Sequence, residues 1–228
     1  MSFIGIDIGA SFIKGAVLKT ESSSVEHVIR VPFPEFLPDL LSSYREVNPI
    51  MIIEKVKDVL RELLPLADCE GIVMCGQMGG LIFTNNSGEP LSNYISWQDQ
   101  RATTLEKKIT KIESLHLGNE FKSSLPLLSW LFERKMIPDK SMPVSLSDFV
   151  IANLCGCIPI IEATNAEAFG IYNLVSHNWD YDVCLKLGLR GLKLPSLCQF
   201  GDIVGMFNGI PCYASIGDQQ CALLGSLL

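Results

Sequence analysis

The first twenty residues, MSFIGIDIGASFIKGAVLKT, constrain the fold more than any other stretch of this 228-residue chain. Apolar and β-branched residues lie on both sides of a glycine-containing turn, which is a pattern typical of a β-hairpin. We therefore expect a hairpin from Phe3 to Leu18. This hairpin places the carboxylate of Asp7 at the end of its first strand, directly before the turn.

Residues 22–80 predict further strands and a helix that packs on the sheet. Residues 22–48 predict a third strand and then an extended, proline-containing surface segment. In NPIMIIEKVKDVLRELLPL, Asn48 is a candidate N-cap, Pro49 takes the first helical position, and the apolar spacing is that of an amphipathic helix. The stretch EGIVMCGQMGG predicts a buried strand that ends in a loop.

The second half of the chain predicts connecting helices and then short strands. We expect residues 101–136 to be helical in pieces, and Ser145 or Ser147 to cap a helix that closes at Gly156. No repeat and no low-complexity segment divides the chain. The sequence therefore favours one α/β domain.

Composition excludes several classes of function. Lys+Arg total 18 against 25 Asp+Glu, so we expect neither a nucleic-acid partner nor an anionic membrane surface. No apolar run reaches the roughly 20 residues that a membrane-spanning helix needs. The eight cysteines lie mostly in apolar runs without a preceding signal peptide, which predicts reduced thiols in a cytoplasmic protein. Cys155 and Cys157 form the only close pair, and with three scattered histidines we expect no metal site there.

The turn in GIDIGASFIKG has the residue types of a phosphate-binding loop. Gly9 allows the backbone to approach a ligand, and the hydroxyl of Ser11 and the turn amides can donate to phosphate oxygens. Lys14 adds positive charge, and Asp7 can hold a hydrated Mg²⁺. An ordinary hairpin with an acidic residue at its edge is the alternative.

A second acidic residue ends a strand near the end of the chain. In YASIGDQQCALLG, Asp218 follows a strand-like run and precedes a helix-like run. Transfer of a phosphoryl group to an alcohol needs one carboxylate to orient the metal and another to accept the hydroxyl proton. The alternative is that Asp218 only caps the last helix.

The stretch SNYISWQDQRA combines an aromatic residue, an amide, an acid and a base, namely Trp97, Gln98, Asp99 and Arg101. Such sets bind sugars, because an indole covers the apolar face of a sugar while charged groups bridge its hydroxyls. The alternative is a surface ion pair between Asp99 and Arg101 beside a buried tryptophan.

Taken together, these loops resemble one family. DIGASFIK, GQMGG, ISWQDQRA, ATNAEAFGIYNL followed by NWD, and GDQQCALLG occur in the order and at the approximate spacing of the FGGY carbohydrate kinases. This group contains glycerol kinase, xylulokinase and sedoheptulokinase, and the resemblance spans nearly the whole chain. It implies an actin-like, ribonuclease-H-like α/β domain with a mixed five-stranded sheet and flanking helices.

The resemblance also implies roles for the phosphate loop and the second carboxylate, with ATP and Mg²⁺ as cofactors. Asp7 falls at the Mg²⁺·phosphate site, and Gly9, Ala10 and Ser11 form the first phosphate loop, with Lys14 close by. Asp218 falls at the general base that takes the proton of the sugar hydroxyl.

The resemblance further implies a small-molecule sugar as the partner. Seven residues fall where family members line the sugar pocket: Gln77, Met78, Trp97, Asp99, Arg101, Asn165 and Gln219. The layout is most similar to that of sedoheptulokinase, so a ketose of the sedoheptulose or xylulose type is the expected substrate. Three positions depart from the family: Gly79 replaces a usual histidine, Ala10 a common threonine, and Glu162 a usual aspartate.

The length of the chain leaves two functional hypotheses. Family members are about twice as long, and residues 1–228 resemble only their first domain, without the C-terminal nucleotide-binding domain. In the first hypothesis the chain is the sugar-binding half of a kinase, inactive without a second domain that another chain could supply. In the second it is a non-catalytic remnant that binds a sugar or a protein, and the surface that normally faces the second domain favours a homodimer.

Overall fold

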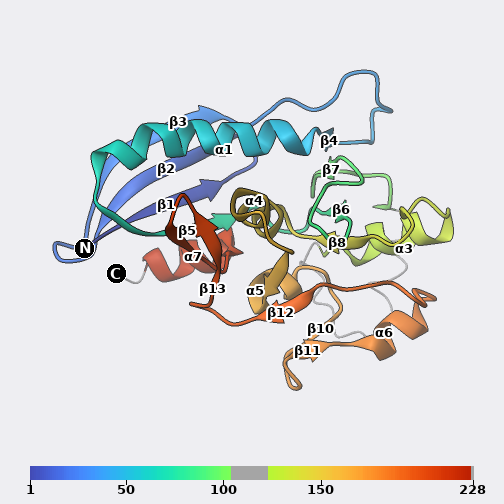
Figure 1. The fold of residues 1–228 in the computed structure, drawn as a ribbon. Helices are drawn as coiled ribbons and strands as arrows, with labels where there is room; N and C mark the ends of the chain where they lie inside the picture. The colour runs from blue at the N-terminus through green and yellow to red at the C-terminus, as the bar shows by residue number, and fades with distance from the viewer. Residues whose placement is uncertain (104–122, 227–228) are drawn as a thin grey trace.

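The computed structural model describes residues 1–103 and 123–226 (Figure 1). Part of the stretch predicted to be helical in pieces, residues 101–136, therefore lies outside the described residues. Its described end contains the helix α3, Leu125–Glu133.

A mixed sheet of seven strands forms the centre of the fold. Its path runs β13-β14-β5-β1-β2-β3, and β15 pairs with β5 as well. The strands are β1 (Ser2–Ile8), β2 (Phe12–Lys19), β3 (Ser24–Pro32), β5 (Cys69–Gly76), β13 (Ile203–Phe207), β14 (Ile210–Tyr213) and β15 (Ile216–Gly217). The strands β14, β15 and β1 run parallel to β5, whereas β2, β3 and β13 are antiparallel to their neighbours.

The sheet confirms the predicted hairpin and the mixed α/β fold. The strands β1 and β2 pair in antiparallel register with Asp7 opposite Lys14. The sheet has seven strands where five were expected, because the edge beyond β5 is shared by two short strands, β14 and β15, and β13 folds back on β14.

Two helices cover one face of the sheet (Figure 1). The helix α1 (Pro49–Leu63) begins as predicted, with the side chain of Asn48 accepting a hydrogen bond from the amide of Ile50. The helix α4 (Leu146–Cys155) begins after Ser145 and ends at Gly156, whose φ of 65° lies in the left-handed region that favours glycine. Every second residue of β1 and β5 packs beneath these helices, because strand side chains alternate between faces.

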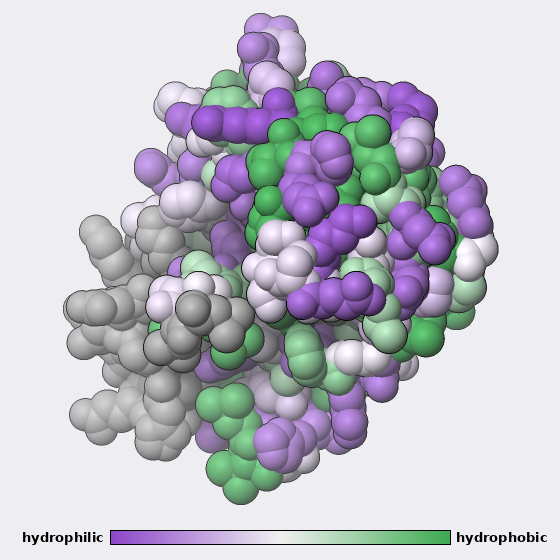
Figure 2. All heavy atoms as spheres, turned by 90° about the vertical axis from the view of Figure 1, so that its left-hand side faces the viewer, coloured by the Kyte–Doolittle hydropathy of each residue, from purple (hydrophilic) through white to green (hydrophobic). Residues whose placement is uncertain are grey.

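The opposite face of the sheet meets the helix α7 (Asp218–Ser226) near β5. Beside this helix lies an apolar groove whose walls include Phe3, Leu18, Val73 and Tyr213. On the side of the molecule that carries both termini, hydrophobic residues gather among hydrophilic ones (Figure 2).

The remaining elements lie beyond the sheet, and most of them pack around a second hydrophobic cluster that includes Phe83, Leu128, Phe169 and Trp179, whereas Val47, Met142 and Val144 belong to the core under α1 and α4. The strands among these elements are β4 (Glu46–Val47), β6 (Ile82–Thr84), β7 (Tyr94–Ile95), β8 (Met142–Val144), β9 (Ile160–Glu162), β10 (Tyr172–Asn173), β11 (Asn178–Trp179) and β12 (Ser196–Cys198). The helices among them are α3, α5 (Ala163–Glu167) and α6 (Tyr181–Lys186), and a short 3-10 helix, Leu64–Leu66, follows α1. No helix within the described residues is long and apolar enough to cross a membrane.

Candidate active site

The sheet brings the two predicted carboxylates to one edge. The strands β1, β5 and β15 are parallel, with Asp7 beside Cys75 and Cys75 beside Ile216 in the register. Their carboxyl ends therefore meet, and Asp218 is the first residue after β15. Burial is the main cause that raises the pKa of Asp218, and the negative charge of Asp7 raises it further. Residues far apart in sequence thus form one acidic site.

Asp7 forms an ion pair with Lys14 through one carboxylate oxygen, whereas its other oxygen makes a weak contact. Its Oδ2 accepts a hydrogen bond from the Nζ of Lys14 at 2.8 Å, and the two side chains are 34% and 50% exposed. Among the described residues, the only hydrogen-bond donor to Oδ1 is the thiol of Cys75 at 3.9 Å, which is a weak contact. The carboxylate is therefore placed and accessible at the same time.

The turn after Asp7 is tight because of Gly9. The amide of Gly9 donates to the carbonyl oxygen of Phe12 at 3.0 Å. A Cβ at this position would lie 3.0 Å from that oxygen and 3.9 Å from Oδ1 of Asp7. A side chain at this position would therefore be crowded against the Phe12 carbonyl and would contact Asp7. The rest of the predicted phosphate loop is accessible, with Ser11 exposed and Ala10 half-buried.

The pKa of Asp218 is raised above the usual range of an aspartate. Burial is the largest cause, a hydrogen bond from the backbone amide of Gln219 opposes it, and the charge of Asp7 raises the pKa further. A raised pKa makes a carboxylate a better proton acceptor at neutral pH. Gln219 is exposed, and it contributes to the site through the hydrogen bond from its backbone amide to Asp218.

A buried polar network supports the strand that carries Asp218. The carboxylate of Asp148, 1% exposed, accepts hydrogen bonds from the hydroxyls of Ser145 at 2.5 Å and Ser215 at 2.7 Å. The amide of Asn165 donates to Asp148 at 3.1 Å and to the carbonyl oxygen of Ser215 at 3.2 Å. The network thus ties α4 and α5 to the residues just before β15.

Asn165 was expected in the sugar pocket, but its side chain is 1% exposed and donates inside this network. The structure therefore gives Asn165 the role of positioning β15. Next to it, Thr164 accepts a hydrogen bond from the amide of Gly217 at 2.9 Å, and Glu162 accepts from the amide of Thr164 at 2.8 Å. Glu162, which replaces a usual aspartate, still caps α5.

Asp148 predicts a pH dependence of stability. Burial raises its pKa to about 7, although hydrogen bonds from Ser145, Ser215 and Asn165 oppose the increase. The folded state then keeps a proton that the unfolded state releases near pH 4, so this group's contribution to the free energy of unfolding falls as the pH rises from about 4 to about 7. We expect Asp148→Asn to remove this dependence. Urea unfolding at pH 4.5, 6 and 7.5 measures it, and parallel pH profiles for the two proteins would contradict the assignment.

The predicted sugar-binding loop borders a cavity. This cavity has a volume of about 600 Å³, and its walls include Gly79, Ser96, Trp97, Gln98 and Asp99. Gly79, where the family usually carries a histidine, therefore stands in the cavity wall as the sequence indicated.

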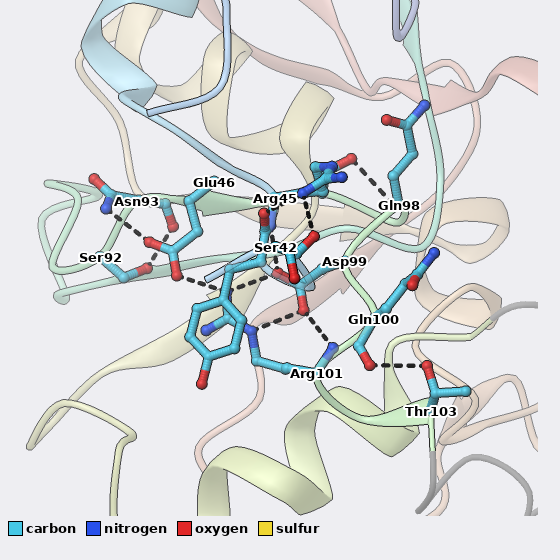
Figure 3. Close-up of polar contacts among 12 residues, drawn as sticks. Ser42, Arg45, Glu46, Ser92, Asn93, Gln98, Asp99, Gln100, Arg101 and Thr103 are labelled. Carbon is cyan, nitrogen blue, oxygen red and sulfur yellow. Dashed lines mark hydrogen bonds and ion pairs between the residues drawn. The ribbon is translucent and has the colours of Figure 1, made fainter. Parts of the chain in front are cut away.

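Arg101 and Asp99 form a buried ion pair that supports this loop (Figure 3). The guanidinium of Arg101 donates to both oxygens of Asp99, at 2.8 and 2.7 Å, and to Glu46 at 2.6 Å. The side chains of Arg101 and Asp99 are 2% and 1% exposed, and Arg101 also stacks over Tyr44 at 3.8 Å. Burial lowers the pKa of Arg101, but its bonds to the two carboxylates outweigh this and raise it.

The pair between Asp99 and Arg101 is thus neither a surface contact nor a free set of sugar-binding groups. Asp99 also accepts a hydrogen bond from the backbone amide of Arg45 at 2.7 Å, so both of its oxygens are engaged within the protein. The pair orients the loop that carries Trp97. Sequence reasoning missed Glu46, because it lies on β4, far along the chain from the loop.

Gln77 is the clearest unsatisfied polar group at the site. It directly follows β5, its backbone amide donates to the carbonyl oxygen of Ile8, and its side chain is 5% exposed. Within residues 1–103 and 123–226, neither polar atom of its side-chain amide has a hydrogen-bond partner, and the same holds for Oε1 of Gln220. Met78, the next residue, packs against Gly217, where any side chain would overlap its sulfur. The loop after β5 thus lies against the end of β15, directly before Asp218.

Comparison with solved structures shows which fold the chain has. Solved structures that share the fold are sugar kinases: a ligand-bound xylulose kinase from Lactobacillus acidophilus matches with a TM-score of 0.85 at 18% identity, covering 98% of this chain and 49% of that one. A glycerol kinase from Plasmodium falciparum with ADP matches with a TM-score of 0.86 at 19% identity, covering 99% and 50%. The expected actin-like α/β fold is thereby confirmed.

The chain belongs to the FGGY family of carbohydrate kinases, since the N-terminal domain of that family matches residues 2–225. The xylulose kinase of Bacillus subtilis is 26% identical over 247 residues, covering 98% of this chain and 49% of that protein. The sedoheptulokinase of Mus musculus is 25% identical over 253 residues, covering 98% and 53%. The chain therefore spans about half the length of these relatives.

Proposed function

We propose that this chain is the sugar-binding half of an ATP-dependent carbohydrate kinase that phosphorylates a hydroxyl of a ketose, of the xylulose or sedoheptulose type. One observation carries the proposal: the carboxylates of Asp7 and Asp218 meet at the carboxyl edge of the sheet. A phosphoryl transfer to an alcohol needs such a pair, with one carboxylate for the metal and one for the proton.

Asp218 acts as the general base. Its raised pKa suits the acceptance of a proton from a sugar hydroxyl near neutral pH. Its position is held by the backbone amide of Gln219 and by the anchoring of Gly217 to Thr164. Positioning matters because a catalytic base must lie within hydrogen-bond reach of the proton that it removes.

The residues around Asp7 fit Mg²⁺ and a polyphosphate. Asp7 keeps Oδ1 open to a cation, Lys14 supplies a half-exposed positive charge, and Gly9 leaves room for close approach. Bound Mg²⁺·ATP would supply the phosphoryl group. Asp7 would hold the metal, while the turn from Gly9 to Ser11 and Lys14 would contact phosphate oxygens.

The loop after β5 and the Trp97 loop bind the sugar. The amide of Gln77, which has no partner in the described part of the chain, matches the hydroxyls of a polar ligand, because a buried amide without partners costs free energy until a ligand satisfies it. Trp97 offers an aromatic wall to the cavity of about 600 Å³, and Gly79 in place of histidine widens it. Met78 adds an apolar contact between Gln77 and the catalytic edge.

The nucleotide half comes from outside residues 1–228 in this proposal. The relatives are about twice as long as this chain, and the kinase reaction requires ATP to be aligned with the sugar and shielded from water. We therefore expect the isolated chain to bind sugar without appreciable turnover.

Sugar binding tests this function through Gln77. Removing the amide with Gln77→Ala should weaken ketose binding by roughly ten-fold, since a lost hydrogen bond to a buried site costs on the order of 1–3 kcal/mol. Titration calorimetry of the chain with xylulose, sedoheptulose, glycerol and gluconate measures the affinity for each. The matched control is Gln199→Ala, which alters an exposed glutamine in a loop on another part of the chain.

The proposal expects a ketose to bind more tightly than glycerol or gluconate, and Gln199→Ala to bind as the unchanged chain does. Failure of every compound of the panel to bind would contradict the proposed sugar binding, and an unchanged affinity of Gln77→Ala would contradict the contact between Gln77 and the sugar.

A further inference from the structure

Three thiols lie around one glycine, away from the acidic edge of the sheet. Cys155 ends α4 and Cys157 follows it in the stretch LCGC, whereas Cys212 lies on β14. The glycine is Gly205 of β13, which pairs directly with Cys212 in the antiparallel register. The proposed kinase function uses none of these residues.

Because Gly205 has no side chain, Cys155 can pack directly against its backbone. A Cβ on Gly205 would lie 2.5 Å from the Cβ of Cys155 and 2.9 Å from its sulfur, closer than real side chains approach. The same point lies 3.4 Å from the sulfur of Cys157. Paired residues of antiparallel strands have their Cβ atoms about 4.5–5.5 Å apart. Cys155 therefore reaches over β13 to the side chain of Cys212.

Cys155 and Cys212 differ in access to solvent and interact with each other. Cys155 is half-buried and Cys212 is completely buried. The interaction between the two thiols raises the pKa of Cys155 and lowers that of Cys212, as expected for sulfur atoms that lie close together. The thiol of Cys157 donates to the carbonyl oxygen of Val204 at 3.3 Å and also interacts with Cys155.

We propose that Cys155 and Cys212 are a redox modification site, forming a reversible disulfide when a peroxide oxidises the protein. The peroxide oxygen adds to the sulfur of the accessible Cys155, which gives a sulfenic acid and releases one molecule of water. The sulfur of Cys212 then attacks that sulfur, the S–O bond breaks, and the hydroxyl leaves as a second water with the thiol proton. Two thiols and one hydrogen peroxide thus give one disulfide and two waters.

The disulfide would join α4 to the strand that leads to the catalytic edge. The helix α4 carries Asp148, and β14 continues through Ser215 to Asp218. The crosslink closes the chain from Cys155 to Cys212, and a disulfide across a long loop stabilises the folded state. Oxidation should therefore raise the melting temperature by about 5 °C or more in a protein of this size.

The test treats the purified 228-residue chain with hydrogen peroxide, alkylates the remaining thiols after denaturation, and counts them by mass spectrometry. We expect six alkylated thiols in place of eight, and a reducible peptide pair that joins Cys155 to Cys212. Cys155→Ser and Cys212→Ser should each prevent this pair and the rise in melting temperature. Cys184 lies in the hydrophobic cluster that includes Phe83 and Trp179, so the Cys184→Ser variant should still form the Cys155–Cys212 pair.

Gly205→Ala provides a variant that keeps every thiol. The added methyl group displaces the side chain of Cys155, so the yield of the crosslinked peptide should fall several-fold. The melting temperature of each reduced variant shows whether it is folded. Eight alkylated thiols after oxidation of the folded chain, or a crosslink between Cys155 and Cys157, would overturn the proposal.

Discussion

Replacing Asp218 by asparagine in a kinase assembled with this domain should lower kcat by about 10²- to 10⁴-fold, the usual contribution of a general base. Asparagine keeps the size of the side chain and can accept the same backbone hydrogen bond from Gln219, but it cannot take the proton of the sugar hydroxyl. Sugar affinity should change little. Sugar-dependent ADP release with Mg²⁺·ATP measures kcat, and calorimetry measures the affinity.

The matched control is Asp202→Asn, which changes an exposed aspartate that accepts a hydrogen bond from the amide of Gln199 at 2.9 Å. This variant should keep the full rate. Equal rates for Asp218→Asn and Asp202→Asn would show that Asp218 only caps α7, which was the alternative that the sequence left open.

Removing the guanidinium of Arg101 should lower the free energy of unfolding by about 3–5 kcal/mol, the cost typical of breaking a buried ion pair from one side. Arg101→Ala leaves the carboxylates of Asp99 and Glu46 without a counter-charge, and Asp99 is 1% exposed. The loop that carries Trp97 loses its anchor at the same time, so sugar binding should weaken as well. Urea unfolding followed by circular dichroism measures the stability.

Arg61→Ala is the matched control, because Arg61 forms exposed ion pairs with Asp58 and Glu54 on α1. It should change the stability by less than about 1 kcal/mol. Arg101→Lys should fall between the two, since a single ammonium cannot bridge both carboxylates in the same way. A loss below about 1 kcal/mol for Arg101→Ala would contradict the view that this pair is a structural support.

Local signals in the sequence were sufficient to predict the first hairpin and the start of α1. The alternation around Asp7 predicted the first hairpin, and the Asn48-Pro49 pair predicted the start of α1. These features depend on neighbouring residues, so a short stretch of sequence contains them. The number of strands was less predictable, because β14 and β15 are short strands defined by their pairing with β5.

The supports of the site could not be predicted in this way, because they depend on contacts between distant segments. Asp148 meets Ser215 across 67 positions of the chain, and Arg101 meets Glu46 across 55. The sequence pattern indicated that Asn165 belongs near the site, but not that its amide points into the network beneath β15. A polar residue inside an apolar stretch, such as Asp148 in SLSDFVIANL, was the one signal for this network.

The most direct test of the kinase-half proposal is the transfer of labelled γ-phosphate from Mg²⁺·ATP to a ketose, measured for this chain alone and together with the nucleotide-binding half of a full-length family member. The proposal predicts no appreciable transfer by the chain alone, and transfer in the assembled protein that Asp218→Asn abolishes. Rapid transfer by the chain alone, or assembled protein that binds the ketose and ATP without any transfer, would contradict it.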